Sequence, residues 1–389
     1  MPSAALPINT IIVDAGVTAI TGVQYPTLDA ACAYSNTRAG YVEIGSSTVT
    51  VTINSAQATV ADPSLLKDGD ILAVATTGQT LENDYKIQSV NKVTGAVVFR
   101  CGFRWASGTY SVVFRRPVSW LIKIRNGAYS LSAAESLFIP ASANVSIVGE
   151  SKAGVVVTGN GKAIAMAGTS GSVLVKNMTA TLSGSATGLA LLRSHGANTV
   201  GLASAIMEAV DLITAVGSSG NSIFFIGASF SGKNILISHR GTVSPDIWVD
   251  GLDIDGLIMT NDARHDQELM SFSAGGQAAR TNYATKPWNM KNVDMSTGYM
   301  FVNCPVTAAL SQDKITNIQN SRFDDNVGFG PLIQILGPTA GTYKHIVTIK
   351  DSLVGEVGST ADIYIETPAA VTLSLVNTTK VGGTPCVVI

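Results

Sequence analysis

The sequence predicts an all-β protein built as a parallel β-helix, and three observations carry this prediction. Its 389 residues include 46% apolar and only 13% charged residues, whereas an ordinary soluble domain has roughly 25% charged residues. Aromatic residues make up 6%, so the apolar fraction is mostly Val, Ala, Ile and Leu, which suit stacked strands. A strand-like motif also recurs at intervals of 17 to 41 residues, and such repetition is typical of a solenoid.

The recurring motif ends in an asparagine or in a residue that can replace it at a turn. The stretch SVLVKNMTATLSG at 172–184 gives the fullest copy. Each copy alternates apolar and polar residues and lacks a helical apolar stripe. A rung of a parallel β-helix explains the repetition, because neighbouring rungs lie only about 4.8 Å apart. The aligned turn positions are Asn177, Ala209, Asn234, Gly251, Asn292, Asn320, Asp351 and Asn377.

Asparagine at this turn has a physical reason. Its side chain tolerates the left-handed backbone conformation and hydrogen-bonds the local backbone or a like residue on the next rung. The 41-residue interval between Gly251 and Asn292 indicates a loop inserted at a corner, since solenoid rungs accept insertions there. With two or three further rungs before Asn177, the stack has about ten coils and a length on the order of 50 Å.

The first part of the chain predicts a cap for the solenoid. Residues 1–54 are expected to hold an N-terminal capping helix and the first coil, with the helix at YPTLDAACAYS (25–35). A helix at the open end would cover the exposed core and the unpaired strand edges. An ordinary surface helix fits the same residues.

The next segment differs in character from the repeats. Residues 55–117 contain four or five short strands with Asp-Gly and Thr-Gly turns, a pattern that predicts a small antiparallel, β-barrel-like module. The solenoid pattern resumes with IKIRNGAY at 122–129, so the β-helix is expected to occupy residues 118–389.

Composition and cysteine spacing argue against several partners. No apolar run approaches the roughly 18 residues that span a bilayer, and no Lys or Arg precedes Arg38, so the start lacks a basic secretory segment. The formal net charge is −2 with Lys and Arg dispersed, which argues against a nucleic-acid partner. Four cysteines and four histidines are scattered, so we expect buried free thiols, no metal and no cofactor.

Three stretches of the sequence resemble a known family. YPTLDAACAYS, GYVEIGSSTVTV and IKIRNGAYSLSAAESLFIPASANVSIVGES follow the order seen at the start of pectate-lyase-like right-handed β-helix proteins. The inserted segment ending in SVVFRRP resembles small β modules near the N-terminus of bacteriophage tailspikes and related virion proteins. The likeness covers roughly residues 25–60 and 117–389.

The resemblance implies more than the composition does. It implies a right-handed β-helix, a homotrimer, and contact with other virion proteins through the N-terminal region. It also implies a virion component assembled in the cytoplasm of a bacterial host. A monomer with unusually apolar flanks is the alternative for the oligomeric state.

The resemblance also directs attention to carboxylates, because tailspikes of this architecture often cleave host surface polysaccharide with paired acids. Asp211, Asp253 and Asp294 each lie two residues after an aligned turn position. Stacked acids at one repeat position could form a catalytic pair, so Asp253 and Asp294 are candidate catalytic residues. Solvated corner acids are the alternative interpretation.

The insertion in the longest interval supplies further candidates. It begins with the most polar stretch of the chain, NDARHDQE at 261–268, which contains Asp266 and Glu268. Tyr283 and Trp288 follow, and their rings are suited to stacking on a sugar. Because function concentrates in long loops on rigid scaffolds, we add both acids as catalytic candidates and both aromatics as glycan-binding candidates. A subunit contact or a solvated lobe fits the same segment.

Two functions of different classes follow. The first is a non-enzymatic virion protein of the tailspike, fibre or capsid-decorating type that presents a rigid β-helix to the host surface, and the sparse carboxylates favour it. The second is a depolymerase tailspike that hydrolyses or lyases host glycan. Asp324-Asp325 resembles the acid pair of polygalacturonase-like enzymes, but the Gly-His-Gly and Arg-x-Lys segments of that family are missing. A free-standing bacterial lyase is a third reading.

Overall fold

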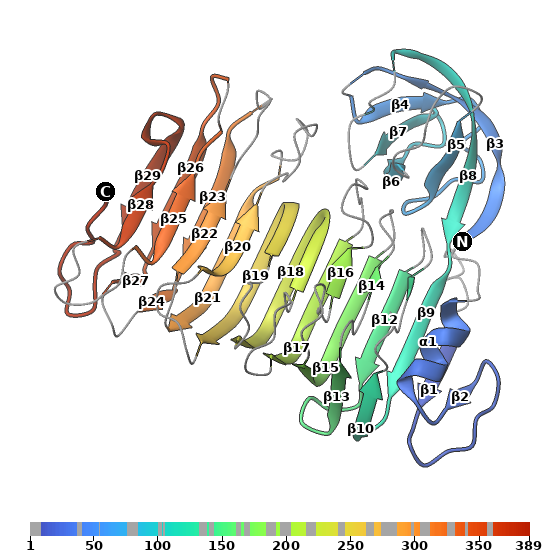
Figure 1. Ribbon diagram of the computed structural model, residues 1–389. Coiled ribbons are helices and arrows are strands. Elements are labelled where there is room, and N and C mark those ends of the chain that lie inside the picture. The colour runs from blue at the N-terminus through green and yellow to red at the C-terminus, as the bar shows by residue number, and fades with distance from the viewer. Residues whose placement is uncertain are drawn as a thin grey trace.

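The computed structural model shows a long solenoid with a small barrel beside its N-terminal end (Figure 1). It describes residues 9–36, 41–53, 55–75, 85–99, 103, 106–131, 138–139, 144–160, 165–166, 172–183, 192–194, 204–214, 223–239, 246–261, 268–273, 286–296, 299–303, 312–324, 331–338, 341–355 and 361–389.

The solenoid is a parallel β-helix with three sheet faces, and the expected all-β fold class is confirmed. Every pairing between its named strands is parallel, so each coil bonds to the coils before and after it. Face 1 comprises β1 (Asn9–Val13), β9 (Ser119–Ile124), β12 (Asn144–Gly149), β15 (Ser172–Ser183), β17 (Ser204–Thr214), β18 (Ile223–His239), β19 (Asp246–Asn261), β21 (Trp288–Ser296), β23 (Lys314–Gln319), β26 (His345–Lys350) and β29 (Val371–Val376).

The other two faces share the longest strands with face 1. β15, β17, β18, β19 and β21 bend from face 1 onto face 2, and β18 and β19 also begin on face 3. Face 2 adds β10 (Gly127–Leu131), β13 (Val155–Asn160), β24 (Arg322–Asp324) and β27 (Leu353–Val354). Face 3 adds β11 (Phe138–Ile139), β14 (Ala165–Met166), β16 (Leu192–Ser194), β20 (Glu268–Ser273), β22 (Tyr299–Asn303), β25 (Ile333–Leu336) and β28 (Ile363–Ile365). The 3₁₀ turn η1 (Pro368–Ala370) precedes β29.

The corner between faces 1 and 2 has the left-handed backbone that the asparagine repeat predicts. At Asn177, Ala209, Asn234, Asn292, Asn320, Asp351 and Asn377, φ lies between 48° and 55°. The side chains also bond along the stack: Asn320 Nδ2 donates to Asn292 Oδ1 at 2.5 Å, and Asn377 Nδ2 donates to Asp351 Oδ1 at 3.0 Å. The turn prediction is therefore correct at these positions.

One aligned turn position is wrong. In β19 the left-handed residue is Gly256, with φ of 84°, and Gly251 instead lies in the extended part of the strand, paired with Ser229. The rung is shifted by five residues from the expected alignment, so the interval before Asn292 is shorter than predicted. Only a residue that tolerates positive φ can occupy the corner, and both glycines satisfy that condition in the sequence.

Inward-facing aliphatic and aromatic side chains fill the solenoid. Ile122, Ile147, Val175, Met207 and Ile254 are each at most 1% exposed and stack at one register position of face 1. The same residues on the same face repeat from coil to coil because each coil must present a matching surface to its neighbours.

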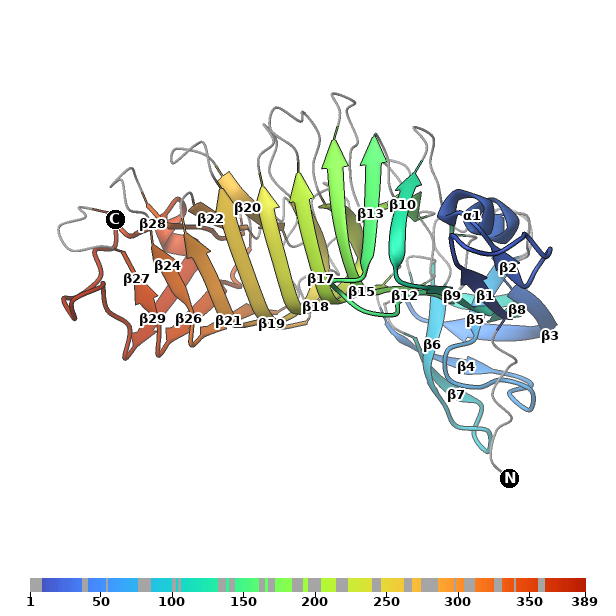
Figure 2. The same cartoon turned by 90° about the horizontal axis from the view of Figure 1, so that it is seen from below.

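The expected capping helix is present. α1 (Leu28–Asn36) packs against β1, β10 and β11 and against β2 (Gln24–Tyr25), and it buries Leu28, Ala31 and Cys32. Figure 2 shows it at the end of the solenoid beside β1. Burial raises the pKa of the Cys32 thiol, and Cys32 and Cys386 are both free. Among the residues described above, no helix combines the length and the apolar character needed to cross a membrane.

The inserted module is a closed six-stranded antiparallel barrel with the order β3-β4-β7-β6-β5-β8. It starts earlier than expected, because Tyr41 in β3 pairs with Pro117 in β8 and not with a coil. The first coil therefore uses β1, and residues 41–51 belong to the barrel. Its strands are β3 (Tyr41–Val51), β4 (Gln57–Val60), β5 (Ile71–Ala75), β6 (Tyr85–Val90), β7 (Ala96–Phe99) and β8 (Gly108–Pro117).

Candidate functional site

The three acids that the repeat alignment grouped do not stack on one another. Because the corner of β19 is Gly256, Asp253 lies on face 1, where Ser231 and Asn289 flank it. Asp294 lies on face 2, between Ile258 and Arg322. The expected shared position of Asp253 and Asp294 is wrong, since the displaced corner moves Asp253 onto a different face.

Asp211 also lies on face 2, but an ion pair occupies it. Its register partners are Thr179 and Leu236, and its Oδ1 lies 2.5 Å from Lys152 Nζ. This ion pair reaches across the intervening coil of β15, and Asp211 faces no second acid among its register partners.

Trp288 is not an exposed sugar-stacking residue. It begins β21 on face 1 with its side chain inward, and none of its surface is exposed. Lys314 Nζ lies 4.4 Å from the centre of its ring, and His345 meets the ring edge-on at a centroid distance of 6.4 Å. The expectation that Trp288 contacts glycan is wrong, because the strand register places this ring inside the core.

Three candidates from the insertion remain, Asp266, Glu268 and Tyr283. Asp266 and Tyr283 lie outside the described residues. The backbone of Glu268 begins β20 on face 3, in register with Tyr299.

A row of hydroxyl, amide and carboxylate side chains runs along the outward side of face 1. It is called the polar ladder below and consists of Ser231, Asp253, Asn289, Asn317, Thr348 and Ser374. Asn317 Nδ2 donates to Asn289 Oδ1 at 3.0 Å, which fixes the orientation of both amides. The ladder therefore offers donors and acceptors at the strand spacing of about 4.8 Å on a rigid surface.

A charged cluster on face 2 contains Asp324, whose carboxylate pairs with Arg322 through one oxygen only. Asp324 points outward in register with Ser296 but is only 5% exposed. Arg322 Nε donates to Asp324 Oδ2 at 3.1 Å, whereas Oδ1 is buried and has no hydrogen-bond partner. Asp294 is exposed on the neighbouring strand, aligned with Arg322.

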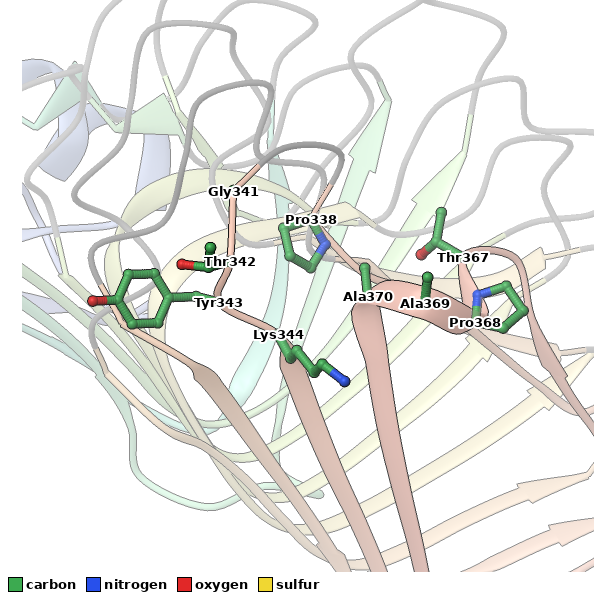
Figure 3. A pocket seen from close by; sticks show the side chains of 9 residues that line it. All are labelled: Pro338, Gly341, Thr342, Tyr343, Lys344, Thr367, Pro368, Ala369 and Ala370. Atoms are coloured by element: carbon green, nitrogen blue, oxygen red, sulfur yellow. The ribbon is translucent and has the colours of Figure 1, made fainter.

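A cleft lies at the corner between faces 3 and 1, near the C-terminal end of the solenoid (Figure 3). Its volume is about 550 Å³, within the range of roughly 300–1,000 Å³ typical of small-ligand sites. Thr342, Tyr343 and Lys344 form one side, and the turn Thr367–Ala370 of the next coil forms the other. Tyr343 is 41% exposed.

The two loops that form the cleft are fixed to one another at its base. Gly337 N donates to Thr367 Oγ1 at 2.7 Å, and Glu366 N donates to Ile335 O at 3.0 Å. A Cβ at Gly337 would lie 2.6 Å from Ala370 O, so the backbones approach as closely as a glycine allows. The cleft is therefore preformed.

Buried polar side chains lie behind the cleft, inside the coil. Lys314 and His345 occupy adjacent positions of one inward row, and neither is exposed. His345 Nδ1 lies 3.0 Å from Leu336 O, and its Nε2 lies 2.8 Å from Thr316 Oγ1. Since a carbonyl only accepts, Nδ1 carries a proton, and in the neutral ring Nε2 accepts from the Thr316 hydroxyl.

The sequence contained a signal for this cluster that the motif search missed. Lys314 and His345 each lie six residues before a corner, Asn320 and Asp351. Positions two and four residues before a corner point inward in the same strands, so the period of two places these polar residues inward as well. Tyr343 and Lys344 lie in the turn before β26 and carry no such periodic signal.

Burial of His345 predicts a pH-dependent stability. Desolvation, aided by the nearby Lys314 charge, lowers the pKa of His345 from 6.5 to about 4. Between these values the unfolded chain binds a proton that the native ring does not, so stability should fall as pH decreases from 6.5 to 4, by up to roughly 3 kcal/mol. Urea unfolding across this range measures the loss.

The matched control for this pH dependence is His345→Gln, which can donate to Leu336 O and accept from Thr316 but cannot titrate. Its stability should vary less between pH 6.5 and 4 than that of the unchanged protein. An unchanged pH dependence in this variant would show that another group is responsible.

Within the described ranges, no three His, Cys, Asp or Glu side chains gather as metal ligands would. No family model matches the sequence, and no curated protein matches it.

Solved structures with a similar architecture include three phage tailspikes. The tailspike gp61 of Pseudomonas phage phi297 has a TM-score of 0.43 and 11% identity, with 87% of this chain and 62% of that chain covered. The gp54 tailspike of Acinetobacter baumannii phage AP22, solved with a capsular saccharide, has a TM-score of 0.40 and 13% identity, with 86% and 67% covered. For gp49 of Pseudomonas phage LKA1 the values are 0.37, 11%, 86% and 67%.

The chain thus spans about three fifths to two thirds of the length of these tailspikes. The epimerase AlgE4 A-module of Azotobacter vinelandii also aligns, with a TM-score of 0.35 and 12% identity over 69% of this chain and 88% of the epimerase chain. The chain folds as a parallel β-helix, and phage tailspikes are among the solved structures that it resembles.

Proposed function

We propose that this protein is an attachment component of a phage virion, of the tailspike or fibre type, and that it binds a host surface glycan along its β-helix. The polar ladder is the observation that carries the proposal. A polysaccharide repeats its hydroxyl groups at regular intervals, and the ladder repeats amide and hydroxyl groups on successive coils. Because the side chains stand on a hydrogen-bonded stack, little conformational entropy is lost when they bind.

Two of the described carboxylates are engaged in ion pairs, which favours binding over cleavage at their positions. Glu208 lies 2.9 Å from Lys176, and Asp211 pairs with Lys152. Such acids stabilise the stack and are not available as proton donors or nucleophiles without breaking an ion pair. Only 13% of the residues are charged, and this composition suits recognition through hydrogen bonds.

The proposal predicts that the ladder amides contribute to polysaccharide binding. The full chain would be applied to an array of bacterial capsular and O-antigen polysaccharides, and we expect it to bind a subset. The double variant Asn289→Ala/Asn317→Ala should bind about ten-fold more weakly, because each lost hydrogen bond is worth roughly 0.5–1.5 kcal/mol. Titration by biolayer interferometry measures the change.

The matched control changes two hydroxyl side chains on face 2. Thr158→Ala/Thr181→Ala alters outward residues of the adjacent strands β13 and β15 and should leave affinity unchanged. Loss of binding in this control with full binding by the ladder variant would place the glycan on face 2. Failure of the unchanged protein to bind any polysaccharide would contradict the proposed function.

A second candidate function, glycan cleavage, is favoured by the unused oxygen of Asp324 beside Asp294. Diagonal neighbours on adjacent strands lie roughly 7–8 Å apart at their Cα atoms, a separation compatible with paired catalytic acids. Release of reducing ends from a bound polysaccharide would support this function if Asp294→Asn and Asp324→Asn both abolish it. The same assay with Asp253→Asn and Asp266→Asn tests the acids proposed from sequence alone.

The proposal includes a homotrimer that contacts other virion proteins through its N-terminal region. Aliphatic side chains stand outward on face 2, with Val156, Ile258 and Leu353 between 36% and 46% exposed, and sister chains would cover them. Multi-angle light scattering should give three times the chain mass of 40.3 kDa. A mass of one chain at micromolar concentration would contradict the trimer.

A further inference from the structure

The cleft formed by residues 338, 341–344 and 367–370 has the composition of a site for a single sugar ring. Pro338, Pro368 and the two alanines give it apolar surface, and the hydroxyl groups of Thr342 and Thr367 line it. Tyr343 also lines it and is 41% exposed, and Figure 3 shows its ring directed away from the Thr367–Ala370 side. An exposed aromatic ring with hydroxyl groups nearby suits a pyranose, whose faces are apolar and whose rim is polar.

The positive charge of Lys344 in the cleft favours an anionic sugar over a neutral one. Lys344 is its one charged lining residue, and its ammonium group makes no ion pair with any residue in the described part of the chain. Figure 3 shows the side chain extending toward β29, the strand that follows Ala370. The nearby Asp313 carboxylate accepts a hydrogen bond from the Lys344 backbone N–H at 2.8 Å.

The backbone holds Lys344 in place from both sides. Lys344 N bonds Asp313, and Lys344 O accepts from Lys314 N at 2.9 Å. The buried Lys314 side chain lies behind the same wall and bonds Lys286 O at 2.6 Å. The cation at the cleft therefore stands on a fixed support, which reduces the entropy lost when it pairs with a ligand.

We propose that this cleft binds an anionic pyranose of the recognised glycan, with Lys344 paired to the acidic group and Tyr343 against the ring. This inference rests on the proposed glycan-binding function and names the class of unit that the site selects. It places an end of the recognised polymer next to the last rungs of the polar ladder, because the cleft precedes β26 and β29, which carry Thr348 and Ser374.

The test uses monosaccharides with the full chain. Saturation-transfer NMR would be recorded with glucuronate, N-acetylneuraminate, glucose 6-phosphate and neutral glucose. We expect a dissociation constant on the order of 1 mM for at least one anionic sugar and binding about ten-fold weaker for glucose. A response to glucose 6-phosphate alone would identify phosphate as the recognised group, and a response to the carboxylated sugars would identify carboxylate.

Two variants and one control locate the site. Lys344→Gln should reduce the affinity for the anionic sugar to that for glucose. Tyr343→Leu should reduce the affinity for both the anionic sugar and glucose. Lys350→Gln is the control, since Lys350 is exposed at the end of β26, the strand that follows Lys344, and its Nζ lies 3.7 Å from Asp351 Oδ2. Equal affinity for charged and neutral sugars, or an unchanged affinity in Lys344→Gln, would overturn the inference.

The experiments can contradict the cleft inference and the proposed function independently of one another. If polysaccharide binding depends on Asn289 and Asn317 but no anionic sugar responds to Lys344→Gln, the cleft inference is wrong and the proposed function stands. If the cleft binds glucuronate while no polysaccharide binds the chain, the proposed function is wrong and the cleft is a small-molecule site.

Discussion

Replacing Trp288 by Ala should lower the free energy of unfolding by about 3–5 kcal/mol and leave glycan binding unchanged. The ring is completely buried and contacts Lys314 and His345, so its removal leaves a large cavity that the neighbouring coils can close only in part. Guanidinium unfolding followed by circular dichroism measures the loss. Polysaccharide binding would be compared at a temperature where the variant is folded.

The comparison variant is Tyr343→Ala, which removes an exposed ring from the cleft. Its stability should change by no more than about 0.5 kcal/mol, and its affinity for the anionic sugar should fall. A Trp288→Ala protein of unchanged stability would show that this ring is not in the core. Reduced glycan binding in that variant under folded conditions would restore Trp288 as a binding residue.

Replacing Asn320 by Val should destabilise the protein by about 3 kcal/mol. The left-handed conformation costs a residue with a Cβ about 1–2 kcal/mol, and a β-branched residue more. The change also removes the hydrogen bond from Asn320 Nδ2 to Asn292 Oδ1, worth roughly 1 kcal/mol. Thermal unfolding and guanidinium titration both report this difference.

Asn320→Gly separates the two contributions, because glycine accepts positive φ but has no side-chain amide. Its loss should be about 1 kcal/mol, much of it from the missing hydrogen bond. If the Val and Gly variants were equally stable, the corner conformation would not limit which residues can occupy it.

The repeat could be predicted from the sequence because its physical requirement is local. An asparagine that takes positive φ must recur wherever the chain turns the same corner, and it does so at Asn177, Asn234, Asn292 and Asn320. The cap was predictable for a similar reason. The apolar residues of α1 recur at helical spacing, and the first coil of a solenoid has an open end that such a helix can cover.

The alignment was wrong at the one rung where two glycines, Gly251 and Gly256, could equally well occupy the corner. The stretch VDGLDIDGL contains Asp-Gly-Leu twice, at 250–252 and 255–257, and either glycine could turn the corner. Pairing with β18 selects Gly256, and that choice is made by contacts between coils. The resulting shift moved Asp253 away from Asp294.

The site could be predicted only in part, because sequence polarity does not report which side of a strand a residue occupies. Trp288 follows a polar segment, yet its register turns it inward. Tyr343 and Lys344 lie near the turn at 367–370 only because two coils are stacked. No pattern in the sequence predicts that these two segments line one cleft.

The entry and exit of the barrel have a consequence for inheritance. The chain enters the barrel at Tyr41 and leaves it at Pro117, and these two residues are direct register partners. The barrel is therefore connected to the solenoid at one place in the chain, between α1 and β9. A segment attached in this way can be exchanged by recombination for another small domain without altering the spacing of any coil. The barrel can therefore change in evolution while the coils and their outward rows of side chains stay the same.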